Sequence, residues 1–131
     1  MAEHTGLIET HVGNVAPAVD TIAGRGVRAL RAIRAGHVIE RCPVIVIPPD
    51  EMETIDETAL YGYAYEWDDG YAFALGYGSL YNHSSTPNAE WHRVDGDDVI
   101  EIIATTDIAA GDEVRFDYSR GTGEVWFDPL D

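Results

Sequence analysis

The chain of 131 residues contains no lysine. It has eight arginines and 24 acidic residues, which gives a formal net charge of −16. A body with this charge repels phosphate, so nucleic acid and anionic membranes are disfavoured as partners and basic partners are favoured. Hydrophobic residues nevertheless make up 45% of the chain, which is typical of a folded domain. We therefore expect residues 1–131 to form a single domain with one core.

Cysteine and long apolar runs are also scarce. Cys42 is the only cysteine, so the chain can form neither an intramolecular disulfide nor a cysteine-based zinc site. No other spacing of ligand residues suggests a metal. The apolar runs are too short for a transmembrane helix, and residues 1–10 lack the apolar stretch of a secretory signal. We expect a cytoplasmic protein.

Short β-prone runs between turn residues predict a mostly β fold. The segment 91–104, which has an Asp/Gly turn at its centre, predicts a hairpin. Helical signals are weak, and we expect only one or two helical turns within 50–60. The clearest β-prone runs, each bounded by Pro, Gly or Asp, are 44–47, 71–75 and 99–103.

Charge is unevenly distributed along the chain. Five of the eight arginines lie within 25–41, whereas the residues between Cys42 and His92 include nine acidic residues and no lysine or arginine. This segment forms either an ordinary solvated acidic surface or a surface that attracts a cationic substrate. The sequence alone leaves both interpretations open.

Three segments carry glycines or dense polar groups that suit a binding site. In 24–29, glycines allow the backbone to approach a ligand, although the third glycine of a dinucleotide motif is missing. The segment 76–88 holds two amides, an imidazole and several hydroxyls, a density that either stabilises a turn or lines a site. The segment 108–118 predicts a turn at Ala110 and Gly111, followed by a strand.

Each polar residue of 76–88 also has a structural explanation when it is considered alone. Asn82 and Asn88 are common turn residues, and a lone His83 is more often a hydrogen-bonded core residue than a catalyst. The pair His83 and Ser84 indicates a hydrolase only weakly, because no nucleophile elbow surrounds it.

Together and in this order, the three segments resemble the SET-domain protein lysine methyltransferases. The family's glycine-rich opening is similar to 24–29, and its I-x-x-G-x-x-I-E stretch fits 33–40. Its N-H-S-x-x-P-N signature is matched at every position by 82–88, and its G-E-E-L-x-x-D-Y signature is similar to 111–118. The resemblance extends over about 8–131 and is closest to the minimal, stand-alone, prokaryote-like form without pre- or post-SET zinc segments.

The resemblance implies a mostly β SET-domain fold, in which several small β-sheets surround a knot-like crossing, with short helices and 3₁₀ turns. The tyrosine-bearing segment would then pass beside the N-H-S segment. The resemblance also implies that 42–75 is a substrate-side insert and that 119–131 closes the site. A homodimer is compatible with this arrangement.

The activity implied by the resemblance is methyl transfer from S-adenosylmethionine to a lysine amine in a Lys/Arg-rich protein or peptide. Tyr118 would be the catalytic residue, and its hydroxyl would act as a hydrogen-bonding guide and not as a strong base. The alternative is a catalytically weak SET-like module that binds basic peptides. The residues implied to bind the cofactor are Arg25, Gly26, Val27, Asn82, His83 and Trp126.

A lysine substrate needs an apolar, aromatic channel for its methylene stem and ammonium head. The aromatic residues that alternate from Tyr61 to Trp67 fit a strand with one aromatic face. Core or hairpin packing explains the same pattern equally well. The residues expected to line the channel are Tyr63, Tyr65, Tyr81, Trp91 and Phe116.

Overall fold

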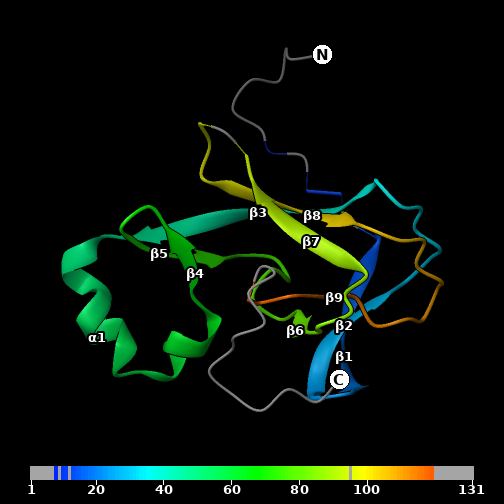
Figure 1. Ribbon diagram of the computed structural model, residues 1–131, viewed down its shortest axis with the longest axis horizontal. Helices are drawn as coiled ribbons and strands as arrows, with labels where there is room; N and C mark the ends of the chain where they lie inside the picture. The colour runs from blue at the N-terminus through cyan, green and yellow to red at the C-terminus, as the bar shows by residue number, and fades with distance from the viewer. Residues whose placement is uncertain (1–7, 9, 12, 95, 120–131) are drawn as a thin grey trace.

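A computed structural model describes residues 8, 10–11, 13–94 and 96–119, which fold into three small β-sheets (Figure 1). This confirms the mostly β fold. Strands β1 (Val15–Thr21) and β2 (Gly24–Ala29) form an antiparallel hairpin. A second sheet has five strands in the order β4-β5-β3-β8-β7. Its strands are β3 (Val38–Ile47), β4 (Tyr65–Trp67), β5 (Gly70–Ala74), β7 (Ala89–Arg93) and β8 (Val99–Ala104).

The long strand β3 joins the two halves of the five-stranded sheet (Figure 1). Its first part pairs with β8 and its last part, from Val44 to Ile47, pairs with β5. The hairpin expected within 91–104 is confirmed as the antiparallel pair β7–β8.

The five-stranded sheet is curled so strongly that side chains of its two edge strands, β4 and β7, are in contact. Tyr65 of β4 packs edge-on against Trp91 of β7, with 4.9 Å between ring centroids. On the same face, β5 presents only small buried residues, which let Gly78 of the 75–81 turn pack closely against Ala74. These small residues are Gly70, Ala72 and Ala74.

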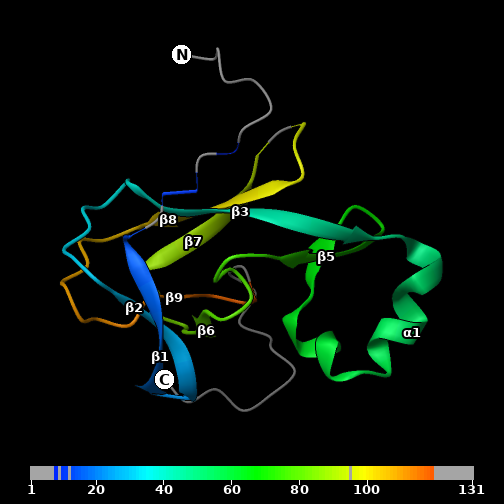
Figure 2. The same cartoon turned by 180° about the vertical axis from the view of Figure 1, so that it is seen from behind.

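The helical segment lies at the opposite end of the molecule from the β1–β2 hairpin (Figure 2). The one or two turns expected within 50–60 are confirmed by η2 (Pro49–Glu51) and α1 (Met52–Asp56), which precede η3 (Ala59–Tyr63). Within the described ranges, the structure contains no helix with the length and apolar character needed to span a membrane.

The expectation of one continuous aromatic strand from Tyr61 to Trp67 was wrong. Tyr61 and Tyr63 belong to the 3₁₀ helix η3, and only Tyr65 and Trp67 lie on β4. The Thr58 hydroxyl caps η3 by accepting a hydrogen bond from the Leu60 amide at 3.2 Å. This local bond favours a turn over an extended chain, and the alternation of aromatic residues does not register it.

Two segments far apart in the sequence run side by side in the third sheet. Strand β6 (Asn82–His83) pairs in parallel with β9 (Arg115–Phe116), so the N-H-S segment and the tyrosine-bearing segment are neighbours as expected. The Asn88 side chain extends this pairing, because its Nδ2 donates to the Glu113 carbonyl and its Oδ1 accepts from the Arg115 amide, each at 2.9 Å. Asn88 therefore holds the crossing together.

The hydrophobic core lies between the curled sheet, the β1–β2 hairpin and the β6–β9 pair. The sheet and the hairpin contribute buried aliphatic residues and β9 contributes the buried Phe116, which ties the crossing to the rest of the domain. The largest fully buried aliphatic side chains are those of Val27, Ile39, Ile100, Ile102, Ile108 and Val114.

Candidate active site

A cavity of about 570 Å³ opens inside the curl of the five-stranded sheet. Its wall includes Gly78, where a Cβ atom would lie 2.5 Å from the Ala74 Cβ and 2.9 Å from the Cys42 sulfur. Glycine at this position therefore lets the 75–81 turn pack closely against the sheet. The aromatic residues that line the cavity are Tyr61, Tyr63, Tyr65, Tyr71, Tyr81, Trp91, Phe116 and Tyr118.

The structure brings all five residues expected to form the channel into this one cavity, together with Tyr118. Two of them, Tyr81 and Phe116, are also buried in the core. These two rings therefore belong both to the core and to the cavity lining.

Tyr118 is held at both its backbone and its hydroxyl. Its amide donates to the His83 Nδ1 at 3.0 Å, and its hydroxyl donates to the Tyr81 carbonyl oxygen. Burial raises the pKa of Tyr118 to about 12, with Tyr63 and Glu113 adding to the shift. Tyr118 is therefore a neutral hydrogen-bonding group near pH 7 and a poor general base.

His83 orients the backbone of Tyr118. Because its Nδ1 accepts the Tyr118 amide proton, the ring proton of neutral His83 lies on Nε2. The neighbouring Ser84 is buried, and its hydroxyl accepts a hydrogen bond from the Thr86 amide at 3.0 Å. Ser84 thus caps a turn, and this arrangement gives no support to a hydrolase.

The glycine-rich segment 24–29 forms strand β2, and its three candidate residues have different surroundings. Val27 is fully buried, and its carbonyl accepts a hydrogen bond from the Val114 amide at 2.8 Å. Arg25 is exposed and donates from Nη2 to the Tyr63 hydroxyl at 3.2 Å, which links β2 to η3. Gly26 lies so close to Asn82 Nδ2 that a Cβ atom would approach to 2.6 Å.

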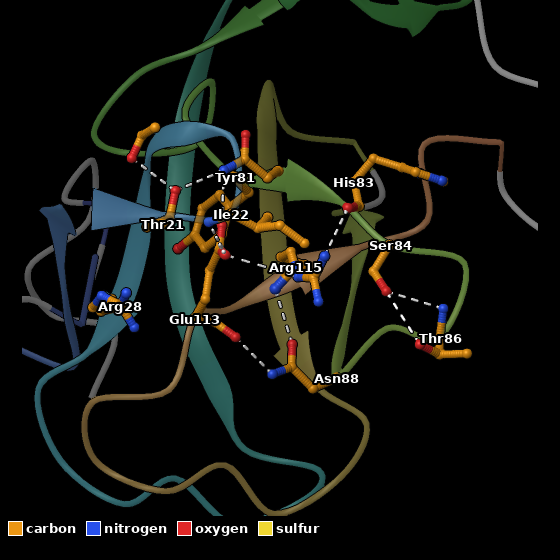
Figure 3. A network of polar contacts seen from close by, with 12 residues as sticks. Thr21, Ile22, Arg28, Tyr81, His83, Ser84, Thr86, Asn88, Glu113 and Arg115 are labelled. Carbon is orange, nitrogen blue, oxygen red and sulfur yellow. Dashed lines mark hydrogen bonds and ion pairs between the residues drawn. The ribbon is translucent and has the colours of Figure 1, made fainter. Parts of the chain in front are cut away.

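Polar contacts join the β1–β2 hairpin, the β6–β9 pair and Glu113 just before β9 (Figure 3). Asn82 of β6 belongs to this network. Its Nδ2 lies 2.7 Å from Glu113 Oε2, 3.0 Å from the Arg25 carbonyl oxygen and 3.2 Å from the Thr21 hydroxyl. Sequence reasoning did not single out Glu113, although it belongs to the third motif. The fold brings Asn82 beside that motif, and Glu113 therefore becomes a hydrogen-bond acceptor for the Asn82 side chain.

Sequence reasoning also missed the buried carboxylate of Glu40. It accepts hydrogen bonds from the Tyr81 hydroxyl at 2.7 Å and from the Tyr77 amide at 2.9 Å. Desolvation and the adjacent Glu40 charge raise the pKa of Tyr81 well above its ordinary value. Tyr65 adds a hydrogen bond of 2.6 Å from its hydroxyl to the Gly78 carbonyl. These bonds fix the cavity wall.

Trp126, which the resemblance assigned to the cofactor, lies outside the described residues. The acidic segment is described in full, and eight exposed carboxylates follow one another along η2, α1 and the β4–β5 hairpin without a basic residue between them. They are Asp50, Glu51, Glu53, Asp56, Glu57, Glu66, Asp68 and Asp69.

The parallel crossing and the aromatic cavity that Tyr118 lines define the class of this domain. The chain belongs to the SET-domain family, whose pattern matches residues 24–119. It is 29% identical to a Plasmodium falciparum protein whose crystal structure is described as that of a candidate histone methyltransferase. The two structures superpose with a TM-score of 0.68 over 91% of this chain and 98% of the other.

Two further relatives are histone-lysine N-methyltransferases. One, from Schizosaccharomyces pombe and described as H3 lysine-37 specific, is 34% identical over 107 residues, which covers 80% of this chain and 71% of that protein. The other, from Xenopus tropicalis, is 31% identical over 129 residues and 86% of this chain. The chain spans about a third, 32%, of the length of the Xenopus protein.

Proposed function

We propose that this chain transfers a methyl group from S-adenosylmethionine to the side-chain amine of a lysine in a basic protein segment. The observation that carries the proposal is the neutral, partly buried Tyr118 in an aromatic cavity, directly beside the N-H-S segment. Membership of the SET-domain family and the names of the relatives support the same chemistry.

The residues around Gly26 suit the amino-acid end of S-adenosylmethionine. A side chain at this position would collide with the Asn82 and Glu113 side chains, so glycine lets these polar groups pack directly against the β2 backbone. Arg25, Gly26 and Val27 would bind the cofactor through β2, while Asn82 and His83 would bind it from β6. When bound, the cofactor supplies a reactive methyl group on a sulfonium.

The cavity prepares a lysine for attack in two ways. Aromatic rings accommodate the apolar methylene stem and attract the cationic head. At the same time, removal from water and a nearby positive charge both lower the pKa of a lysine ammonium, which favours the neutral amine. Tyr118 stays protonated, so its role is to orient groups at the inner end of the cavity and not to remove the lysine proton.

The substrate class follows from charge. Eight exposed carboxylates lie between residues 50 and 69, and the same segment contains η3, which lines the cavity. Exposed charges of opposite sign attract one another over about 10 Å at moderate ionic strength. We propose that the target lysine lies in a Lys/Arg-rich segment.

Incubation of the chain with a cell lysate and isotope-labelled S-adenosylmethionine, followed by mass spectrometry, tests the proposal. We expect label on lysine side chains of basic proteins. Because the chain has no lysine, label on a lysine side chain must come from a substrate. Binding of basic peptides without any transfer would instead identify a catalytically weak binding module. Label on the chain's own side chains would contradict lysine specificity.

A further inference from the structure

Glu113 joins the segments that meet beside the proposed cofactor site (Figure 3). Its Oε2 accepts a hydrogen bond from Asn82, and its Oε1 accepts one from the Ile22 amide at 3.3 Å and lies 3.9 Å from Arg115 Nε. Only 11% of the Glu113 side chain is exposed. Contacts with such a shielded carboxylate are stronger than those at an open surface.

The surroundings of Asn82 decide which end of its amide faces Glu113. The Glu113 carboxylate and the Arg25 carbonyl can only accept hydrogen bonds, and the Thr21 hydroxyl already donates to the Gly24 carbonyl at 2.9 Å. The group that faces these oxygens must therefore be the NH₂. The Asn82 amide oxygen is turned away from them and accepts no hydrogen bond from the described residues.

Close packing supports this orientation. A Cβ atom at Gly26 would lie 2.6 Å from both Asn82 Nδ2 and Glu113 Oε2, and 2.7 Å from the Thr21 hydroxyl. The amide, the carboxylate and the hydroxyl thus fill the space above Gly26. Rotation of the Asn82 amide would place its oxygen against the carboxylate, which is unfavourable because both groups are acceptors.

We propose that Glu113 is a positioning residue that holds the Asn82 amide oxygen ready to accept a hydrogen bond from the α-amino group of S-adenosylmethionine. This inference rests on the proposed function. Glu113 acts through Asn82 and does not itself contact the reacting atoms. Without the carboxylate, the Asn82 NH₂ keeps only the Arg25 carbonyl and the Thr21 hydroxyl as partners, so the amide turns more easily. A turned amide would present its NH₂ to the ammonium group, so that two hydrogen-bond donors would face each other.

Two ligands separate this role from general structural support. S-adenosylhomocysteine carries the α-amino group, whereas 5′-methylthioadenosine shares the adenosine and the thioether but lacks the amino-acid end. We expect Glu113→Gln to weaken S-adenosylhomocysteine binding by about tenfold, as for the loss of a charge-assisted hydrogen bond. Binding of 5′-methylthioadenosine, measured by the same calorimetric titration, should stay unchanged.

A double-mutant cycle tests whether the effect passes through Asn82. In an Asn82→Ala background, Glu113→Gln should cause little further loss of S-adenosylhomocysteine affinity, because the amide that it orients is gone. An undiminished further loss, or an equal loss of affinity for both ligands in the single variant, would overturn the proposal. Unchanged binding of S-adenosylhomocysteine by Glu113→Gln would overturn it as well.

Controls keep the outcomes distinct. Glu101→Gln removes a carboxylate that lies 3.2 Å from Arg41 on the distant β3–β8 pair, and it should leave both affinities unchanged. If Glu113→Gln does not fold, Glu113→Asp keeps the charge but withdraws the oxygens from Asn82, and it should show the same selective loss. A wild-type chain that binds neither ligand would overturn the proposed function itself, and this inference with it.

Discussion

The guanidinium of Arg93 lies 4.0 Å from the centroid of the Trp67 ring, although the two residues belong to opposite edges of one five-stranded sheet. Arg93 also forms two hydrogen bonds, at 2.7 Å and 3.3 Å, with the Asp68 carboxylate in the turn that follows Trp67. With the neighbouring Tyr65–Trp91 contact, this pair closes the curl that encloses the cavity.

Replacement of Arg93 by Ala should loosen this closure. We expect a loss of about 1 kcal/mol in the free energy of unfolding, mainly from the cation–π contact with the buried Trp67 ring. Asp68→Asn is the matched control, because it keeps Arg93 over Trp67 and alters only an exposed carboxylate. A larger loss of stability in Asp68→Asn than in Arg93→Ala, measured by urea unfolding, would contradict the assignment.

Tyr118→Phe removes only the hydroxyl that donates to the Tyr81 carbonyl. We expect turnover to fall on the order of 10²-fold, comparable to the loss of one oriented polar group at a reacting centre. Binding of S-adenosylhomocysteine should persist, because the ring and the backbone bond to His83 remain. Near-normal turnover in a steady-state assay would exclude the proposed role of Tyr118.

Gly26→Ala tests the tight packing of the polar network. Its Cβ atom would meet three polar side-chain atoms at 2.6 to 2.7 Å, so the network must move apart. We expect a lower melting temperature and weaker cofactor binding. Gly62→Ala serves as the stability control because its Cβ atom meets nothing within 4 Å. Equal melting temperatures for the two variants would show that the β2 backbone accommodates the added methyl group without loss of stability, which would contradict the tight packing.

Stability should fall at alkaline pH. Burial raises the pKa of Tyr118 to about 12, and raises those of Tyr65 and Tyr81 well above their ordinary value. Since the unfolded tyrosines ionise near pH ~10, their contribution to stability is complete below that pH and is lost as the pH rises through the folded-state values. Absorbance of tyrosinate should therefore rise late and together with unfolding measured by circular dichroism. Ionisation of all seven tyrosines near pH ~10 in a folded chain would refute this.

The acidic segment predicts a salt-dependent substrate affinity. Attraction between exposed charges is screened as ionic strength rises, so KM for a basic peptide should increase with salt while kcat changes little. Neutralising Glu53 and Glu57 together should weaken this dependence, whereas Glu101→Gln, on β8, should not. A KM that does not respond to salt would indicate an ordinary solvated acidic surface.

Local sequence patterns were sufficient to predict many of the strands and turns of this protein. The apolar run before Pro48 became the end of β3, and the segment around the Asp/Gly turn became the β7–β8 hairpin, because strand alternation and turn chemistry act over neighbouring residues. The aromatic residues expected to line a channel do line one cavity. Where a local hydrogen bond overruled the pattern, as Thr58 does at η3, the expected strand was wrong.

The sequence by itself determined the acidic, lysine-free character of the chain, the mostly β fold, and the order of the motifs that identify the family. Only the tertiary structure decided which polar groups act together. Glu40 and Tyr81 are 41 residues apart, and Glu113 and Asn82 are 31 apart. A buried carboxylate takes its role from the donors that surround it, and those donors come together only when the sheet curls and β9 pairs with β6.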